Sequence, residues 1–164
     1  MRLGAGACPV PELLGAGCRV GLGVDGAASN EDYHLTGEVR QAMLLARVRA
    51  AILGRLDGAT TLDARTAWRL ATTGGAECLG WREVGALEPG RRCDVALFRV
   101  DDLLHSGMAD PLESLALAPP ARAESVVVEG RVVVTEGRLL NADEDELAES
   151  LRRASDRLRG VVNA

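Results

Sequence analysis

Apolar residues recur at intervals of three and four between Thr36 and Arg55, which is typical of a helix with one buried face. We therefore predict one long helix over this range, and Gly58 ends the helical stretch. The arginines of this segment fall off the stripe. The stripe itself consists of Val39, Met43, Ala46, Ala50 and Leu53.

Shorter helices are predicted on both sides of the long one. Residues 11–17 have the length of about two helical turns and end in glycine. Asp63 is a good N-cap for a helix that runs to Thr72, and the glycine pair at 74 and 75 is expected to break it. One further turn follows, stopped by Gly80.

A buried strand is predicted between the first of these helices and the long one. Residues 18–25 are bounded by glycine and carry apolar side chains at 20, 22 and 24. A helix, a short turn, a strand and a polar loop follow one another in this way in parallel α/β folds. Such folds place their chemistry at the carboxyl ends of strands, and Asp25 occupies that position.

The second half of the chain predicts β-structure. Residues 94–99 are typical of a strand, and two valine-rich runs at 125–128 and 131–134 flank the dipeptide Glu129–Gly130, which signals a hairpin. A second turn at residues 136 and 137 leads to another short apolar run.

A terminal helix is predicted after this β-rich part. Asp143 can cap it, with Glu146 three residues later in a capping-box arrangement. Its apolar stripe consists of Leu147, Leu151, Ala154 and Leu158.

Composition narrows the classes of function. The 164 residues are 47% hydrophobic and 26% charged, which indicates one globular domain or a piece of a larger one. All 19 basic residues are arginine, 24 residues are acidic, and the net charge is −5, so binding to a nucleic-acid backbone is not expected. Aromatic residues make up 2%, which also argues against base stacking.

No membrane partner is expected either. The chain has no run of about eighteen apolar residues, and its first residues lack the apolar core of a signal peptide. We therefore expect a soluble, cytoplasmic protein. The cysteines at 8, 18, 78 and 93 have no zinc-knuckle or redox spacing, and we expect them to be reduced core residues.

Two kinds of ligand site come into question near residue 25. Residues 21–26 match the pattern G-x-G-x-x-G, which brings a backbone close to a pyrophosphate at a helix N-terminus. The match fits badly, because the glycines lie inside the predicted strand and the next helix starts some ten residues later. Asp25 as a metal ligand fits better, since a carboxylate at a strand end can bind zinc and pass a proton.

Plainer interpretations of the same residues stay open. Asp25 can be an ordinary loop residue or a helix cap. Ser29 and Asn30 can cap the helix that follows them.

The segment around Asp25 also resembles a known family. Residues 23–30, followed by the helix at 38–47, resemble the last barrel strand and loop of the amidohydrolase superfamily. The resemblance is closest to its aminohydrolase branch, which includes 8-oxoguanine deaminases, guanine deaminase-like enzymes and hydroxydechloroatrazine ethylaminohydrolase-like proteins. Residues 66–76 are similar to the helix that follows that strand.

Further segments carry the resemblance along the chain. Residues 84–95 are similar to the family motif G-x-L-x-x-G-K-x-A-D followed by a hydrophobic residue, with Arg91 where lysine is usual and Cys93 where alanine is usual. Both changes are conservative in charge or size. Residues 106–112 and 126–137 resemble the segment that returns to a small β-sandwich.

The resemblance implies an α/β fold class, namely the C-terminal end of a (β/α)8 metal-dependent hydrolase barrel plus strands of the composite β-sandwich. On this basis we expect the end of the barrel, with its last strand and closing helices, at residues 1–83. The returning sandwich strands are expected at 84–140 and a C-terminal helix at 141–164.

The resemblance also implies what this chain does not supply. The family site uses a His-x-His pair on the first strand, further histidines on the fifth and sixth, and a glutamate after the fifth. The chain has two histidines, His34 and His105, and neither fits those positions. We expect His105 to be a surface or packing residue. The chain thus resembles the C-terminal third of the family's enzymes. We expect either that its start was assigned inside a longer gene or that it is the remnant of a truncated gene.

In the complete enzyme the resemblance implies zinc, or another divalent metal, that makes hydroxide available for attack on a ring carbon bearing an amino group. Asp25 matches the catalytic residue that ligates the metal and carries the proton to the leaving amine. Ser29 matches a position near the substrate pocket. The implied substrate is a small heterocyclic amine (8-oxoguanine, a guanine-like base or an s-triazine), and the complete enzyme is expected to be a homo-oligomer.

On its own the chain is expected to bind no metal and to be inactive, because catalytic zinc sites keep three or more protein ligands. The alternative is a noncatalytic protein, either a truncated remnant or an assembly module.

Overall fold

The chain folds into two compact units. A computed structural model describes residues 3–27, 29–30 and 32–162. Unit 1 comprises Met1–Arg92 and Arg99–Ala121, and unit 2 comprises Cys93–Phe98 and Arg122–Ala164. In the described part of the chain, no helix combines the length and the apolar character needed to cross a membrane. The division at residues 83/84 and 140/141 stays a prediction.

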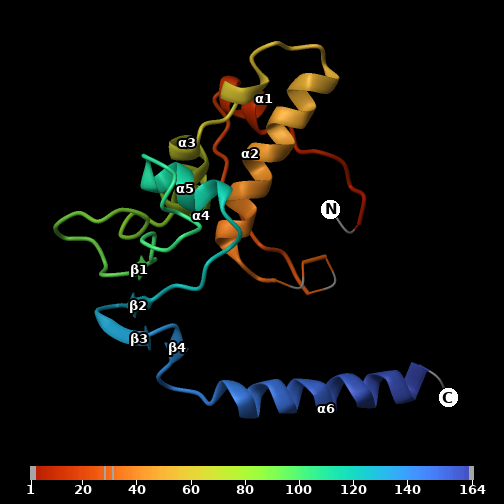
Figure 1. The fold of residues 1–164 in the computed structure, drawn as a ribbon, viewed down its shortest axis with the longest axis vertical. Helices are drawn as coiled ribbons and strands as arrows, with labels where there is room; N and C mark the ends of the chain where they lie inside the picture. Colours follow the sequence, from red (N-terminus) through yellow and green to blue (C-terminus); the bar gives the residue numbers. More distant parts are fainter. Residues whose placement is uncertain (1–2, 28, 31, 163–164) are drawn as a thin grey trace. The chain divides into compact units, whose positions relative to one another are not determined.

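Unit 1 is helical, and its longest helix is the predicted one. α2 (Leu35–Ile52) begins one residue before the predicted start, and Leu53 already lies beyond its end with 55% of its surface exposed. Asp63 caps α3 by accepting a hydrogen bond from the Thr66 amide at 2.6 Å, as predicted. The remaining helical segments (Figure 1) are α1 (Val10–Gly15), a 3-10 turn (Gly58–Thr60), α3 (Ala64–Arg69), a π-helical turn (Leu70–Gly74), α4 (Gly75–Leu79) and α5 (Pro111–Leu117).

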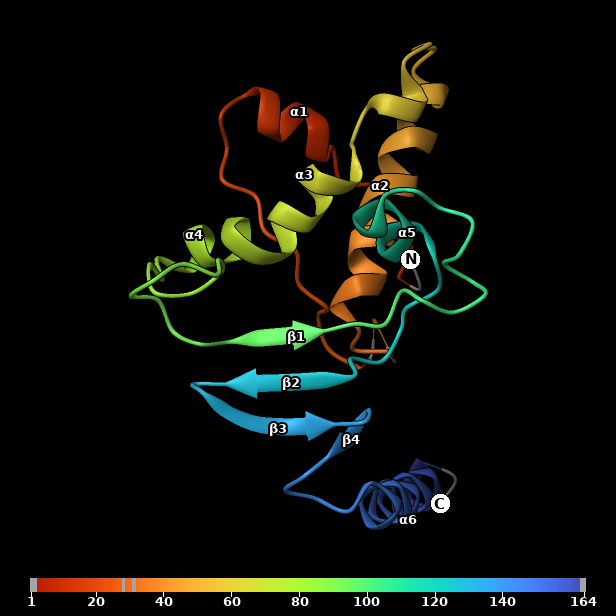
Figure 2. The same cartoon turned by 60° about the vertical axis from the view of Figure 1, so that its left-hand side comes forward.

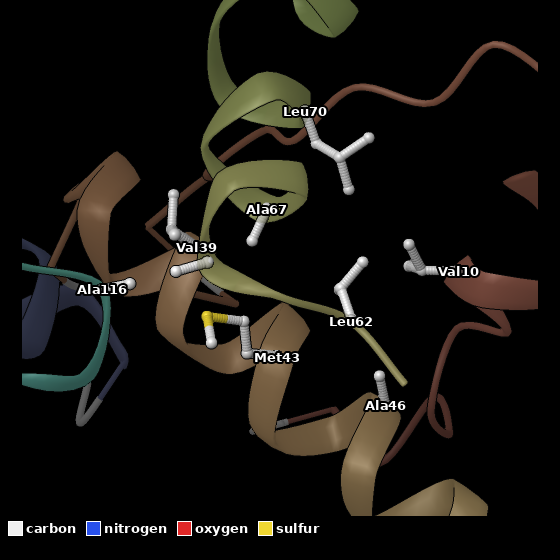
Figure 3. Packing of buried hydrophobic residues seen from close by; sticks show 9 residues of the cluster. Val10, Val39, Met43, Ala46, Leu62, Ala67, Leu70 and Ala116 are labelled. Carbon is white, nitrogen blue, oxygen red and sulfur yellow. The ribbon is translucent and has the colours of Figure 1, made fainter. Parts of the chain in front are cut away.

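The core of unit 1 lies along the predicted stripe of α2. Val39 and Met43 are completely buried, and they face Ala67 of α3 and Ala116 of α5, each also at 0% exposure. Figure 3 shows these side chains turned toward one another, with Val10 of α1 beyond them. Because much of the core is alanine, the helices approach closely, and burial of Met43 and Val39 supplies a large share of the apolar contact.

The strand predicted at residues 18–25 is extended but is not part of a sheet. Its side chains alternate, with Val20, Leu22 and Val24 half-buried and the residues between them exposed. The Leu22 amide donates to the Leu70 carbonyl at 3.1 Å, and no strand within the described residues pairs with the segment. The alternation fits a strand, but a ladder also needs neighbouring strands.

The predicted break at Gly74 and Gly75 is wrong. Both glycines have helical dihedral angles and continue the helix from the π-helical turn into α4. The reason is a close approach of the extended segment: a Cβ on Gly74 would lie 2.6 Å from the Val20 carbonyl oxygen, and a Cβ on Gly21 would lie 2.8 Å from the Gly75 Cα. Gly21 and Gly74 are therefore needed for contact between two backbones.

This contact predicts a strong effect of a single methyl group. Gly74→Ala places a Cβ against backbone atoms, and overpacking of this kind costs about 1–3 kcal/mol. This cost raises the population of molecules in which the α3–α4 region is open by roughly 5- to 150-fold. The rate of proteolysis should rise by the same factor, because it follows the population of the open form. Trypsin cleavage after Arg69 measures the effect. Gly107→Ala, where no heavy atom lies within 4 Å, is the matched control; equal cleavage rates in the two variants would contradict the explanation.

The motif at residues 84–95 forms a loop held by arginine. Arg91 donates through Nη1 to the carbonyls of Arg82 at 2.7 Å and Val84 at 3.2 Å, and pairs through Nε with Glu88 at 2.7 Å. Gly85 has a φ of +89°, and a Cβ there would lie 3.0 Å from the Cβ of Ala76. The motif therefore shapes the chain at this point.

Unit 2 is built on the predicted hairpin. β1 (Val95–Leu97), β2 (Ser125–Val128), β3 (Arg131–Thr135) and β4 (Arg138–Leu139) form one sheet in chain order (Figure 2). All neighbouring strands are antiparallel, as the predicted hairpin requires. Both tight turns are confirmed: Glu129–Gly130 and Glu136–Gly137 have positive φ at both positions, as a type I′ turn requires.

Asp94, the acidic residue of the motif, holds the first of these turns. Its Oδ1 accepts a hydrogen bond from the Glu129 amide at 2.7 Å, and the Gly130 amide donates to the Cys93 carbonyl at 3.0 Å. The predicted terminal helix is also confirmed as α6 (Glu144–Val162), with Asp143 Oδ1 accepting from the amides of residues 145 and 146.

The expectation that the cysteines belong to the core is wrong. Cys8, Cys18, Cys78 and Cys93 are free thiols, and all four are exposed. They lie in loops and at element ends, whereas the core positions of unit 1 are occupied by alanine, valine, leucine and methionine.

Candidate functional site

A pocket of about 520 Å³ lies between the extended segment and α2 in unit 1. Residues 20–25 form one wall. The other wall is one face of α2, with Glu38, Gln41, Ala42 and Leu45 at helical spacing. Both residues singled out from the sequence, Asp25 and Ser29, line this pocket.

Asp25 stands at the end of the extended segment in an unusual backbone conformation. Its φ is +59°, in the left-handed region that non-glycine residues seldom adopt. The Ser29 hydroxyl donates to Asp25 Oδ2 at 2.6 Å, and the amides of Ser29 and Asn30 both donate to the Gly26 carbonyl at 3.0 Å. The turn thus fixes the carboxylate at the pocket wall.

Hydrogen bonding keeps this carboxylate ionised. The Ser29 hydroxyl, and then the backbone at Gly26, hold the pKa of Asp25 below its usual value. Because the pKa is lowered in the folded chain, this interaction favours folding above the ordinary carboxyl pKa and is lost as the pH falls through the lowered value. At neutral pH the site presents an exposed anionic carboxylate.

A second acidic residue of the pocket was missed by the sequence analysis. Asn30 Nδ2 donates to Glu38 Oε1 at 2.8 Å, and Gln41 Nε2 lies 3.5 Å from the same oxygen. Burial raises the pKa of Glu38. The sequence contained a signal for this wall of the pocket. Residues 38, 41, 42 and 45 have helical spacing and lie on the face of α2 next to its buried face.

The plainer role of Ser29 and Asn30 as caps of α2 is wrong. The N-cap of α2 is His34, and no side chain there accepts a capping hydrogen bond. Asn30 Oδ1 instead accepts from the Asp32 amide at 3.1 Å, within the loop before the helix. The side chains of Asp25, Ser29 and Asn30 all serve the loop and pocket.

The two histidines lie away from this pocket. His34 Nδ1 is 2.7 Å from the Thr36 hydroxyl at the start of α2. His105 is buried, at 3% exposure, as a packing residue, and its Nδ1 lies 2.6 Å from Asp102 Oδ1. The hydrogen bond to His105 lowers the pKa of Asp102. Neither histidine lines the pocket that holds Asp25.

The donor set among the described residues is too small for a zinc site. Among residues 3–27, 29–30 and 32–162, no group of three or more His, Cys, Asp or Glu side chains could hold a metal ion together. Asp25 offers one carboxylate, and the oxygen of Glu38 nearest the loop already accepts from Asn30. A catalytic zinc takes three protein ligands and an open position, so the described residues do not fit zinc by themselves.

The described residues thus place an exposed carboxylate at the end of an extended segment, beside a pocket whose other wall is α2. The amidohydrolase family profile matches residues 1–133. The chain belongs to the amidohydrolase family. The predicted family and fold class are therefore confirmed, because the solved structures it resembles are barrel enzymes of this family.

Two relatives show what the chain is similar to. It is 40% identical over 158 residues to an 8-oxoguanine deaminase from Pseudomonas aeruginosa. The matched region covers 96% of this chain and 34% of that protein. It is 38% identical to the zinc-bound structure of an atrazine chlorohydrolase from Arthrobacter aurescens, with a TM-score of 0.82 over 90% of this chain and 32% of that one.

A third likeness points the same way. A zinc-bound adenosine deaminase from Xanthomonas campestris has a TM-score of 0.83 and 31% identity, covering 93% of this chain and 34% of that chain. By their names, the three relatives act on nitrogen heterocycles, and both structures hold zinc. The chain spans about a third of the length of the relatives it matches.

Proposed function

We propose that this chain is the C-terminal part of a zinc-dependent amidohydrolase that hydrolytically deaminates a nitrogen heterocycle. The observation that carries the proposal is Asp25. It is an ionised, exposed carboxylate held in a left-handed turn at the wall of a pocket of about 520 Å³. Membership of the amidohydrolase family supports the reaction class.

Asp25 has two roles in this proposal. It contributes one ligand to a zinc ion whose remaining ligands come from outside the described residues. Asp25 is also an exposed carboxylate that can accept a proton, and a carboxylate that has accepted one can return it to a leaving amine. Because the residues that the structure describes do not fit zinc by themselves, we propose that the chain is inactive on its own.

Ser29 is proposed to serve the substrate side of the pocket. Its hydroxyl already donates to Asp25 at 2.6 Å, so it sets the direction of the free carboxylate oxygen. The Glu38–Asn30 pair on the facing helix supplies further hydrogen-bonding groups. Such polar groups, placed in a partly apolar pocket, suit a heterocycle that carries amino and carbonyl substituents.

The substrate class is a small heterocyclic amine, which we narrow to 8-oxoguanine, a guanine-like base or an s-triazine. The names of the relatives support this range. We further propose a cytoplasmic homo-oligomer, with the barrel end at 1–83, sandwich strands at 84–140 and a C-terminal helix at 141–164.

A chimera tests the proposal directly. This chain replaces the matching third of the Pseudomonas aeruginosa 8-oxoguanine deaminase, to which it is 40% identical. We expect the chimera to bind zinc and to release ammonia from 8-oxoguanine, a guanine-like base or an s-triazine. Zinc is measured by elemental analysis and ammonia by a coupled assay.

The parent deaminase lacking the same third is the matched control, and it should show neither property. A chimera that folds and retains zinc but releases no ammonia from any of these substrates would favour the second candidate, a noncatalytic remnant or assembly module.

A further inference from the structure

The loop that carries Asp25 is attached to α2 through Glu38. Asn30 Nδ2 donates to Glu38 Oε1 at 2.8 Å, in a hydrogen bond that is partly buried. The neighbours of Glu38 in the helix, Gly37 and Val39, are buried, and Val39 belongs to the core of unit 1. Glu38 therefore joins the loop to a part of α2 whose position is fixed by packing.

The backbone of Asn30 connects this attachment to the turn that follows Asp25. The Asn30 amide donates to the Gly26 carbonyl at 3.0 Å. The same carbonyl accepts from the amide and from the hydroxyl of Ser29, at 3.0 Å each. Since Gly26 follows Asp25 directly in the chain, hydrogen bonds lead without interruption from Glu38 to the backbone next to Asp25.

This support matters because the backbone of Asp25 has an unfavourable conformation. Its φ of +59° lies in the left-handed region, and such a conformation persists where the surrounding contacts over-determine it. The hydrogen bond from Ser29 to Asp25 lies within the loop, whereas the bond between Asn30 and Glu38 joins the loop to a helix. Without the bond to the helix, we expect the turn to relax and the Asp25 carboxylate to change its direction.

We propose that Glu38 is a positioning residue, which acts through Asn30 to fix the direction of the Asp25 carboxylate. In this role Glu38 provides an oxygen acceptor, and it does not transfer a proton itself. The inference rests on the proposed function, because it assigns Glu38 a part in the reaction of that same site. Displacement of a reacting group by about 1 Å can lower a rate by about a hundredfold.

Two substitutions of Glu38 in the chimera test whether the acceptor is needed. Glu38→Ala removes it and should lower kcat for ammonia release by about 10- to 100-fold. Glu38→Gln keeps an amide oxygen that can accept from Asn30, so it should restore most of the kcat lost in Glu38→Ala.

A double-mutant cycle with Asp25→Asn separates positioning from a general loss of stability. In the Asp25→Asn background, Glu38→Ala should lower kcat by less than about twofold, because both changes act through the same carboxylate. An equal loss of kcat in both backgrounds would show general destabilisation and overturn the inference. A raised KM with unchanged kcat would show that Glu38 binds the substrate, and would overturn it too.

Hydrogen exchange of the Ser29 and Asn30 amides tests the same role without turnover. In the chimera, Glu38→Ala should speed this exchange about tenfold, because the loop opens more often. The matched control is Glu12→Ala, since Glu12 also ties another segment to α2, through Arg49 Nε at 3.1 Å. It should change neither the exchange nor kcat.

The two readouts keep the two proposals apart. A folded chimera that releases no ammonia would count against the proposed function, and the exchange measurement would still decide whether Glu38 holds the loop. Exchange that is unchanged by Glu38→Ala would overturn the inference, even in a chimera that is an active deaminase.

Discussion

Asp25→Asn in the chimera is expected to lower ammonia release by about 10²- to 10⁴-fold, the range over which a positioned acid or base contributes to catalysis. Asparagine keeps the size of the side chain but cannot carry a proton between water and a leaving amine. It also removes one anionic ligand, so the zinc content should fall. The fold should persist, because the Asp25 side chain is exposed and asparagine keeps an amide oxygen that can accept the hydrogen bond from the Ser29 hydroxyl.

The measurement is steady-state ammonia release together with zinc content and far-ultraviolet circular dichroism. Asp57→Asn is the matched control, since Asp57 is an exposed carboxylate of unit 1 that pairs with Arg55 at 2.8 Å. It should leave turnover unchanged. Turnover retained by Asp25→Asn would refute both proposed roles of Asp25.

The 164-residue chain alone is expected to show no cooperative thermal transition. Not one side chain described in unit 2 is buried, and a small sheet needs packing on a face for independent stability. In unit 1 the core is rich in alanine, which contributes little apolar area. Among the described residues, no strand pairs with the extended segment at 18–25, although the Leu22 amide bonds to the Leu70 carbonyl.

Differential scanning calorimetry and the binding of a hydrophobic dye test this expectation. The chain should give a broad, weak signal and bind the dye strongly, whereas the chimera should melt in one transition. A sharp transition from a monomeric form of the isolated chain would show that these two units are sufficient by themselves.

Local patterns were enough to predict much of the fold. The stripe of α2, the Asp63 cap, both Glu–Gly turns and the start of α6 are set by residues a few positions apart. Such features depend on helical spacing, capping and turn conformation, which neighbouring residues determine.

Contacts between distant segments could not be predicted in the same way. The role of Gly74 depends on the Val20 carbonyl, which is far away in the chain. The Glu38–Asn30 hydrogen bond likewise appears only when the loop folds back against α2. For the candidate site, the sequence therefore indicated Asp25 and Ser29, while the facing wall of the pocket required the structure.

The π-helical turn at Leu70–Gly74 determines the directions in which the side chains of α4 point. Each residue of an α-helix turns the chain by about 100°, and a π-turn accommodates one extra residue without ending the helix. Without that residue, α4 would be rotated by roughly this angle. Ala76, now 7% exposed, would leave its buried position. The backbone at Gly75 would also turn away from Gly21. The number of residues in this segment is therefore constrained, because the loss or gain of one residue would rotate α4 whatever side chains the segment carries.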